Sequence, residues 1–364
     1  MSPLALRQQN GQLLVAGFEG PEIPVELKAL AREFSIGGVV LFKRNVQDPD
    51  QVADVARQIE LLGGELSPWV AVDQEGGRVA RLKRPFTEWP PMIVLGRSGS
   101  VDLARRFARA LADELTAVGV TLDYAPVLDV LTNTKNLVIG DRALADDVEQ
   151  VSELGRVIIS ELQDAGIAAC GKHFPGHGDT SVDSHHDLPL VEHPPDRLRA
   201  IEFKPFEAAI AARVASIITA HVLVPSLDAE WPATLSRRIV TGILRDELQF
   251  TGVIFTDDME MKAIAARWSV PDACVQAVAA GCDGVLVCSG NTDLHVATLE
   301  ALIHAVEDER LPWSQVEESL ARHRRMKERF AARRAARGAT ARGWRPVLGR
   351  ESHAAIAEEM ARFL

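Results

Sequence analysis

A histidine-rich segment carries the densest set of reactive side chains in this sequence. It runs from residue 172 to residue 187 and holds four histidines and three aspartates, with two glycines and a proline to shape the backbone. Burying so many ionisable groups would be too costly, so we expect a loop, and loops on a rigid scaffold often carry function. These side chains suit general acid/base chemistry. A plain polar surface loop and a zinc site are the alternatives.

Two adjacent carboxylates, Asp257 and Asp258, come directly after the hydrophobic run 253–255. Successive side chains of a strand point to opposite sides. One carboxylate is therefore expected to face a reaction site while the other supports it from behind. The alternative interpretation is that one of the two caps the N-terminus of a helix, which carboxylates do well.

Two polar turns contribute further candidates. Segment 73–78 begins with Asp73 and contains two adjacent glycines, which allow close backbone approach to a ligand. Asp73 is suited to accept hydrogen bonds from hydroxyl groups; its alternative role is an ion pair with Arg78 or Arg81. In the turn 139–142, Arg142 has the reach to enter the same pocket.

The elements that must position these residues alternate along the chain. Short runs rich in β-branched residues predict strands at 12–18, 38–42, 69–73, 121–125, 168–173, 216–221, 252–257 and 284–288. Helical periodicity lies between them, for example at 103–111, 147–165, 198–212 and 293–306. Eight such strands predict a closed (β/α)₈ TIM barrel, with an open doubly wound sheet as the alternative.

Polar residues at the predicted strand ends favour the barrel over the open sheet. In a barrel all carboxyl ends of the strands converge on one face, whereas in an open sheet only those beside the switch point converge. The residues concerned are Asp73, Asp123, Lys172, His173, His221 and Asp257. We predict a barrel over residues 1–330, followed at 331–364 by a basic linker and a short helix, 352–363, that packs on the barrel.

Composition limits the function classes. Acidic residues outnumber basic ones by 51 to 40, and the net charge of -11 disfavours a nucleic-acid binder. The stretch 322–350 is an exception, with eleven Lys or Arg residues and the single acid Glu328, and is interpreted as a solvated helix face. No secretory signal and no bilayer-spanning run are apparent, and four cysteines without CxxC spacing indicate reduced core thiols. We expect a cytoplasmic protein, a monomer or weak homodimer, without membrane partners.

Several of these motifs, in this order, resemble glycoside hydrolase family 3, and specifically its single-domain β-N-acetylglucosaminidases (β-hexosaminidases). The signature is Lys-His-Phe-Pro-Gly-His-Gly at 172–178 with Asp-Ser-His at 183–185. The accompanying motifs are Asp-Gln-Glu-Gly-Gly-Arg at 73–78, Asp-Tyr-Ala-Pro-Val-Leu-Asp-Val at 123–130, Ile-Gly-Asp-Arg at 139–142 and Thr-Asp-Asp-Met at 256–259. Two departures stand out: Ala143-Leu144 where the family more often has Ser-Phe, and a bulky segment at 266–269.

The resemblance implies specific roles for residues. Asp257 corresponds to the nucleophile of the family, and His185 with its partner Asp183 corresponds to the general acid/base. The residues implied to hold sugar hydroxyls are Asp73, Arg142, Lys172 and His173. No metal and no cofactor are implied.

The resulting expectation is a retaining exo-β-N-acetylglucosaminidase that removes terminal β-linked GlcNAc through a covalent glycosyl-enzyme. Muropeptides or related oligosaccharides are the expected substrates, in peptidoglycan recycling. The alternatives are a β-glucosidase or GlcNAc phosphorylase of the same family, a non-catalytic sugar-binding barrel, and a metal-dependent amidohydrolase that uses the histidine-rich loop.

Overall fold

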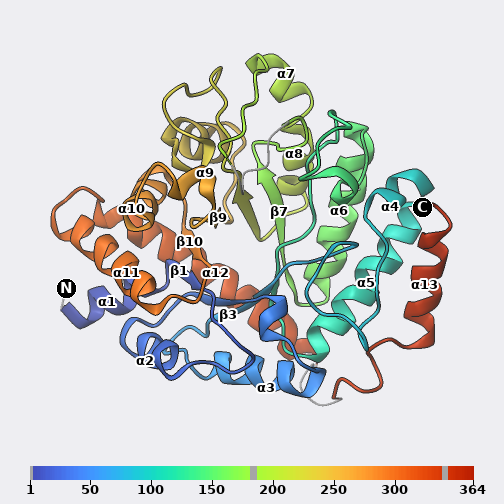
Figure 1. Ribbon diagram of the computed structural model, residues 1–364, viewed down its shortest axis with the longest axis horizontal. Helices are drawn as coiled ribbons and strands as arrows, with labels where there is room; N and C mark the ends of the chain where they lie inside the picture. Colours follow the sequence, from blue (N-terminus) through green and yellow to red (C-terminus); the bar gives the residue numbers. More distant parts are fainter. Residues whose placement is uncertain (1–2, 181–186, 338–342) are drawn as a thin grey trace.

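The computed structural model describes residues 3–180, 187–337 and 343–364. Eight parallel strands close into a barrel in the order β1-β10-β9-β8-β7-β6-β3-β2, and β4 and β5 form a separate two-stranded sheet. Helices surround the barrel (Figure 1). The predicted (β/α)₈ barrel is confirmed. The barrel strands are β1 (Leu14–Ala16), β2 (Gly38–Leu41), β3 (Trp69–Val72), β6 (Leu122–Asp123), β7 (Ala168–Phe174), β8 (Ser216–Thr219), β9 (Val253–Asp258) and β10 (Gly284–Val287).

The small sheet pairs β4 (Gln74–Gly76) with β5 (Val79–Ala80) directly after β3. The α-helices are α1 (Pro3–Gly11), α2 (Val25–Phe34), α3 (Pro49–Glu60), α4 (Ile93–Ser98), α5 (Val101–Ala117), α6 (Val148–Asp164), α7 (Pro195–Ala200), α8 (Lys204–Ala211), α9 (Lys262–Ala265), α10 (Val270–Ala280), α11 (Thr292–Glu307), α12 (Trp313–Arg337) and α13 (Glu351–Ala361). A π-helix spans Arg238–Glu247, and short 3₁₀ turns occupy Lys43–Asn45, Gly140–Arg142 and Ala233–Leu235.

Local sequence explains where several helices begin. The side chain of Asp48 accepts a hydrogen bond from the Gln51 backbone N–H at 2.9 Å, and Pro49 occupies the first turn of α3. Ser100 caps α5 in the same way. These caps satisfy backbone donors that have no partner inside the helix. On α5 the buried residues recur with helical spacing, so one face of the helix packs against the barrel.

Apolar side chains form two main layers. An outer layer lies between the helices and the barrel wall. An inner layer fills the barrel itself, and includes Tyr124 and Phe255 from the strands. Met326 and Phe330 of α12 belong to this inner layer, and Phe330 meets Trp69 edge to face at 6.4 Å between ring centroids. Helix α12 therefore seals the end of the barrel at which the strands begin.

Two sequence predictions need correction. Segment 198–212 is not one helix, because α7 ends at Ala200 and α8 begins at Lys204 with Pro205 in its first turn. Proline has no N–H and clashes with the preceding helical turn, so it starts a helix rather than continuing one. The predicted linker also begins too early. Helix α12 continues past residue 330 to Arg337, because residues 331–337 are alanines and arginines, which favour helix.

The C-terminal helix α13 packs against α4 and α5 (Figure 1). Its His353 lies 2.9 Å from the buried carboxylate of Glu114 on α5, and Arg106 forms a two-bond ion pair with Glu359. Among the residues that the structure describes, no helix combines the length and apolarity needed to cross a bilayer.

Candidate active site

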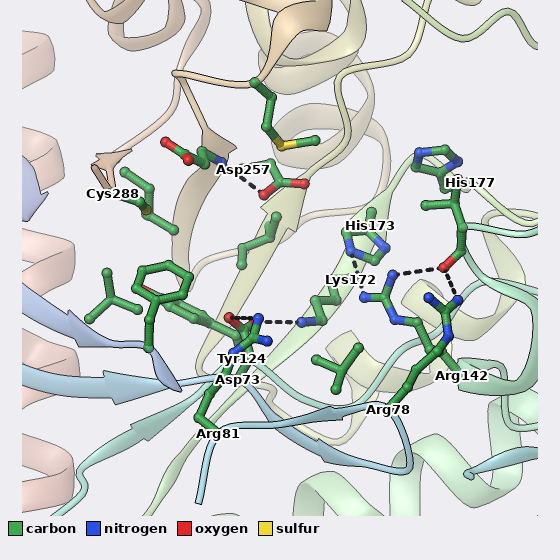
Figure 2. Close-up of a pocket in the computed structure, with 18 residues that line it drawn as sticks. Asp73, Arg78, Arg81, Tyr124, Arg142, Lys172, His173, His177, Asp257 and Cys288 are labelled. Carbon is green, nitrogen blue, oxygen red and sulfur yellow. Dashed lines mark hydrogen bonds and ion pairs between the residues drawn. The ribbon is translucent and has the colours of Figure 1, made fainter. Parts of the chain in front are cut away.

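A polar cavity of about 310 Å³ opens at the carboxyl ends of the barrel strands. Its lining comes from β2, β3, β6, β7, β8, β9 and β10 and the loops that follow them (Figure 2). In a (β/α)₈ barrel this face is where catalytic groups collect. The polar residues of the lining are Asp73, Arg78, Arg81, Tyr124, Arg142, Lys172, His173, His177, Asp257, Asp258 and Cys288.

Lys172 is the centre of a buried ion-pair network on the floor of this cavity. Its Nζ lies 2.8 Å from Asp73 and 2.5 Å from Glu75, while Arg142 binds the same Glu75 through two bonds of 2.8 and 2.9 Å. The side chains of Lys172 and Glu75 are only 3% and 1% exposed. Such groups are tolerated in the interior only because each charge has a partner.

The network keeps its members charged. Burial alone would raise the pKa of Glu75, but Arg142 and Lys172 hold that pKa well below its ordinary value. Burial alone would lower the pKa of Lys172, but Asp73 and Glu75 raise it above the usual range. At neutral pH the cavity therefore presents a fixed ammonium and fixed carboxylates as hydrogen-bonding groups.

His173 is held in place by Asp129, which follows β6. The Nδ1 of His173 lies 2.7 Å from Asp129, and the backbone N–H groups of His173 and His177 also donate to this carboxylate. Gly178 completes the fit, since a Cβ there would lie 1.8 Å from the carbonyl oxygen of Val130. Burial lowers the pKa of His177 to about 4, so this imidazole is neutral at physiological pH.

The adjacent carboxylates on β9 differ in charge state. Burial would raise the pKa of Asp257, but His221, His173 and Lys172 hold it below its ordinary value. Burial raises the pKa of Asp258 to about 7, with further contributions from Glu260 and Asp257. Both side chains line the cavity, so Asp258 is not turned away from it. At neutral pH Asp257 is an anion and Asp258 is partly protonated.

The structure gathers five of the predicted site residues around one cavity: Asp73, Arg142, Lys172, His173 and Asp257 (Figure 2). Asp183 and His185 lie outside the described residues. Arg81 pairs with Asp73 at 3.2 Å, whereas Arg78 pairs with Asp141 at 3.0 Å.

Sequence reasoning missed Glu75, Asp129 and His177 as contributors to the site. Each of them lies inside a motif that the sequence analysis had identified, at 73–78, 123–130 or 172–178. Their position in these motifs could have marked them as site residues. The glycines of the first segment serve the protein itself: a Cβ on Gly76 or Gly77 would press on Met92 or Pro91. Within the described residues, no cluster of three His, Cys, Asp or Glu side chains is arranged to hold a metal ion.

The chain is similar to known proteins over most of its length. Residues 5–326 match the glycosyl hydrolase family 3 N-terminal domain. A β-hexosaminidase of Thiobacillus denitrificans is 41% identical over 261 residues, which cover 70% of this chain and 72% of that protein. A β-hexosaminidase of Pseudomonas aeruginosa is 37% identical over 292 residues, which cover 79% of this chain and 86% of that one.

Solved structures agree with these relatives. The family 3 β-N-acetylglucosaminidase of a Paenibacillus strain superimposes with a TM-score of 0.92 at 37% identity, covering 98% of this chain and 68% of that one. NagZ of Neisseria gonorrhoeae, solved with N-trifluoroacetyl-D-glucosamine, superimposes with a TM-score of 0.77 at 31% identity, covering 96% and 97% of the two chains. The chain is therefore a glycoside hydrolase that belongs to glycosyl hydrolase family 3.

Proposed function

We propose that this enzyme is a retaining exo-β-N-acetylglucosaminidase that releases terminal β-linked GlcNAc. The observation that carries the proposal is the ionised Asp257 in one cavity with the Asp73–Lys172–Glu75–Arg142 network. The relatives named β-hexosaminidase and the neighbour with a bound N-acylated glucosamine support the choice of sugar.

In this proposal Asp257 is the nucleophile. A carboxylate must be deprotonated to attack the anomeric carbon, and the nearby histidines and Lys172 favour that form of Asp257. Retaining glycosidases use such an anion to form a covalent glycosyl-enzyme, which water then hydrolyses. Asp258, with its pKa near 7, is poorly suited to the same role at neutral pH.

The buried network supplies binding groups for sugar hydroxyls. A carboxylate offers about four acceptor positions, and Asp73 uses two of them for Lys172 and Arg81. An ammonium has three donors, and Lys172 uses two of them for Asp73 and Glu75. The remaining donor and acceptor capacity suits a neutral polyhydroxyl ligand, and Arg142 and His173 extend it along the cavity wall.

The general acid/base in this proposal is His185, oriented by Asp183. This assignment rests on the sequence resemblance and on the chemistry of imidazole. An unperturbed histidine titrates near pH 6.5, so it can donate a proton to the leaving oxygen and then accept one from water without a large pKa shift.

We further propose that muropeptides or related cell-wall oligosaccharides are the substrates, in peptidoglycan recycling in the cytoplasm. The sequence resemblance supports the substrate. The four cysteines are free and buried, as expected for a protein of a reducing compartment.

Covalent trapping tests the mechanism. A 5-fluoro-β-N-acetylglucosaminyl fluoride forms the glycosyl-enzyme readily and releases it slowly, because the ring fluorine disfavours positive charge on the sugar. Intact-mass spectrometry is expected to show one added glycosyl group, and peptide mapping is expected to place it on Asp257. Asp257→Asn removes the adduct, whereas Asp258→Asn retains it.

The same experiment has two outcomes that would contradict the proposal. An adduct on another residue would displace Asp257, and turnover of an aryl β-GlcNAc without any adduct would indicate a mechanism without a protein nucleophile. Incubation in phosphate buffer adds a check on the second step. Free GlcNAc is the expected product, and GlcNAc 1-phosphate in its place would replace hydrolysis by phosphorolysis.

A further inference from the structure

A second cavity, of about 220 Å³, lies at the opposite end of the barrel from Asp257. Four arginines line it: Arg213, Arg322, Arg325 and Arg329. We call it the basal arginine cavity. Part of the basic stretch 322–350, interpreted from sequence as a solvated helix face, thus lines a recess rather than a flat surface.

The position of the cavity follows from the barrel topology. Its walls include residues just before β8 and just before β9, and one side of α12. Strand β9 begins at Val253 beside this cavity and ends at Asp258 in the cavity that contains Asp257, which is the catalytic cavity of the proposed function. The two cavities therefore occupy opposite ends of the same strand.

Three of the four arginines of the basal arginine cavity have no acidic partner in the part of the chain that the structure describes. Neither aspartate nor glutamate is part of the described lining. Arg322 is the exception, because it pairs with the buried Asp283 at 2.8 Å and with Glu318 at 3.5 Å. Arg329 donates to the carbonyl oxygen of Arg213 at 3.1 Å but has no carboxylate within ion-pair distance in the described chain, and the same holds for Arg213 and Arg325.

The positive charges of these arginines repel one another. Burial lowers the pKa of Arg329, and the like charges of Arg333 and Arg213 lower it further, against a smaller opposing effect of Asp164. A half-buried guanidinium among like charges is electrostatically unfavourable unless an anion joins it. The lining also includes apolar side chains, among them Phe250 and Met326.

We propose that the basal arginine cavity binds a small phosphate-bearing anion. Three arginines without carboxylates match the two or more negative charges of a phosphate or diphosphate group. Guanidinium forks bind phosphate oxygens through paired hydrogen bonds, which a single ammonium cannot do. The recessed shape and the net charge of -11 favour a small ligand over a nucleic-acid duplex.

Isothermal titration calorimetry at low ionic strength tests this site, with sodium diphosphate and inorganic phosphate as the probes. The wild-type protein is expected to bind one diphosphate, with affinity that falls as NaCl is added. The double variant Arg213→Gln/Arg325→Gln is expected to bind at least about tenfold more weakly. Both side chains are exposed, so their replacement leaves the fold intact.

A matched control removes two other arginines. Arg32 and Arg156 are also exposed and form no ion pair in the described chain, so Arg32→Gln/Arg156→Gln makes the same change in net charge. This control is expected to bind diphosphate like the wild type. Equal weakening in both double variants would reduce the effect to overall charge and would overturn the assignment.

Three further outcomes would also overturn it. The first is no saturable binding of diphosphate by the wild type. The second is binding that the Arg213→Gln/Arg325→Gln variant leaves unchanged, which would place the anion elsewhere, for instance in the catalytic cavity. The third is tighter binding of a short DNA duplex than of diphosphate, since this would identify a nucleic-acid surface instead.

Discussion

Positively charged side chains have different partners at the two ends of the barrel. In the catalytic cavity, Lys172 contacts two carboxylates and Arg142 shares one of them. In the basal arginine cavity, Arg213 and Arg325 face the recess without a carboxylate partner in the described chain. Internally neutralised charges bind a ligand through directed hydrogen bonds, which suits an uncharged sugar. Uncompensated charges attract an anion. Each prediction below tests one side of this contrast.

The largest effect is expected at the catalytic end. His185→Ala should lower hydrolysis of an aryl β-GlcNAc by about 10²–10⁴-fold, the usual range for a general acid. Steady-state kinetics across a series of leaving groups would measure it, and the loss should shrink as the leaving phenol becomes more acidic. His186→Ala is the neighbouring control. A rate close to wild type for His185→Ala would remove this residue from the mechanism.

The next effect concerns the neutralised network. Glu75→Gln leaves Lys172 and Arg142 without their shared anion in a buried place, so the free energy of unfolding should fall by about 3 kcal/mol or more. Urea denaturation measures this change. The control is Glu88→Gln, whose exposed ion pair with Arg84 should contribute about 0.5 kcal/mol or less. Similar losses in the two variants would contradict the account of the network.

A smaller, pH-dependent effect separates the two neighbouring aspartates. The pKa of Asp258 is about 7 in the folded protein, against about 3.9 in an unfolded chain, so folding disfavours its ionisation. Stability is thereby lost as pH rises from about 4 to 7, and an asparagine at this position escapes the loss. Relative to wild type, Asp258→Asn should gain about 3 kcal/mol between pH 4.5 and pH 8.

Asp257→Asn should not show this pH-dependent gain. Its pKa is lowered by folding, so its carboxylate contributes stability above its unfolded pKa. Both pH 4.5 and pH 8 lie above that unfolded value, so the stability of Asp257→Asn relative to wild type should stay nearly constant between them. Urea denaturation at the two pH values measures both variants, and parallel trends would show that the neighbouring carboxylates do not differ in charge state.

The smallest effect is expected at the basal arginine cavity. Because Arg213 and Arg325 have no acidic partners to lose among the described residues, Arg213→Gln/Arg325→Gln should leave the melting temperature within about 2 °C of wild type. Any change should be a slight gain at low salt that disappears at about 1 M NaCl, where charge repulsion is screened. A clear loss of stability would reveal acidic partners and remove the contrast with Glu75→Gln.

Much of the fold could be predicted from the residue patterns of short segments. The run 69–72 is hydrophobic because β3 is buried on both faces, and the same reason applies to the apolar parts of the other barrel strands. Asp73, Lys172 and Asp257 lie at strand ends, so a parallel barrel necessarily brings them to one face. The family resemblance followed from motifs in sequence order, and the family match over residues 5–326 confirms it.

Ion pairs between segments that are distant in the sequence could not be predicted in this way. From the sequence, either Arg78 or Arg81 could form an ion pair with Asp73. In the structure Arg81 pairs with Asp73, and Arg78 pairs with Asp141. The break between α7 and α8 was missed because periodicity outweighed the signal of Pro205. Side-chain packing between elements decides which charged groups come within a few ångströms of one another. The spacing of residues along the chain does not predict these contacts.

The sequence by itself determined the barrel and the residue types at its catalytic face, because strand burial and strand ends are properties of short segments. Only the tertiary structure decided how charges are distributed between the two ends. Glu75 meets Lys172 and Arg142 across three separate segments, and Arg213 meets Arg325 and Arg329 across more than a hundred residues. Electrostatic energy depends on distance in space, so compensation at one end and its absence at the other arise only when the barrel closes.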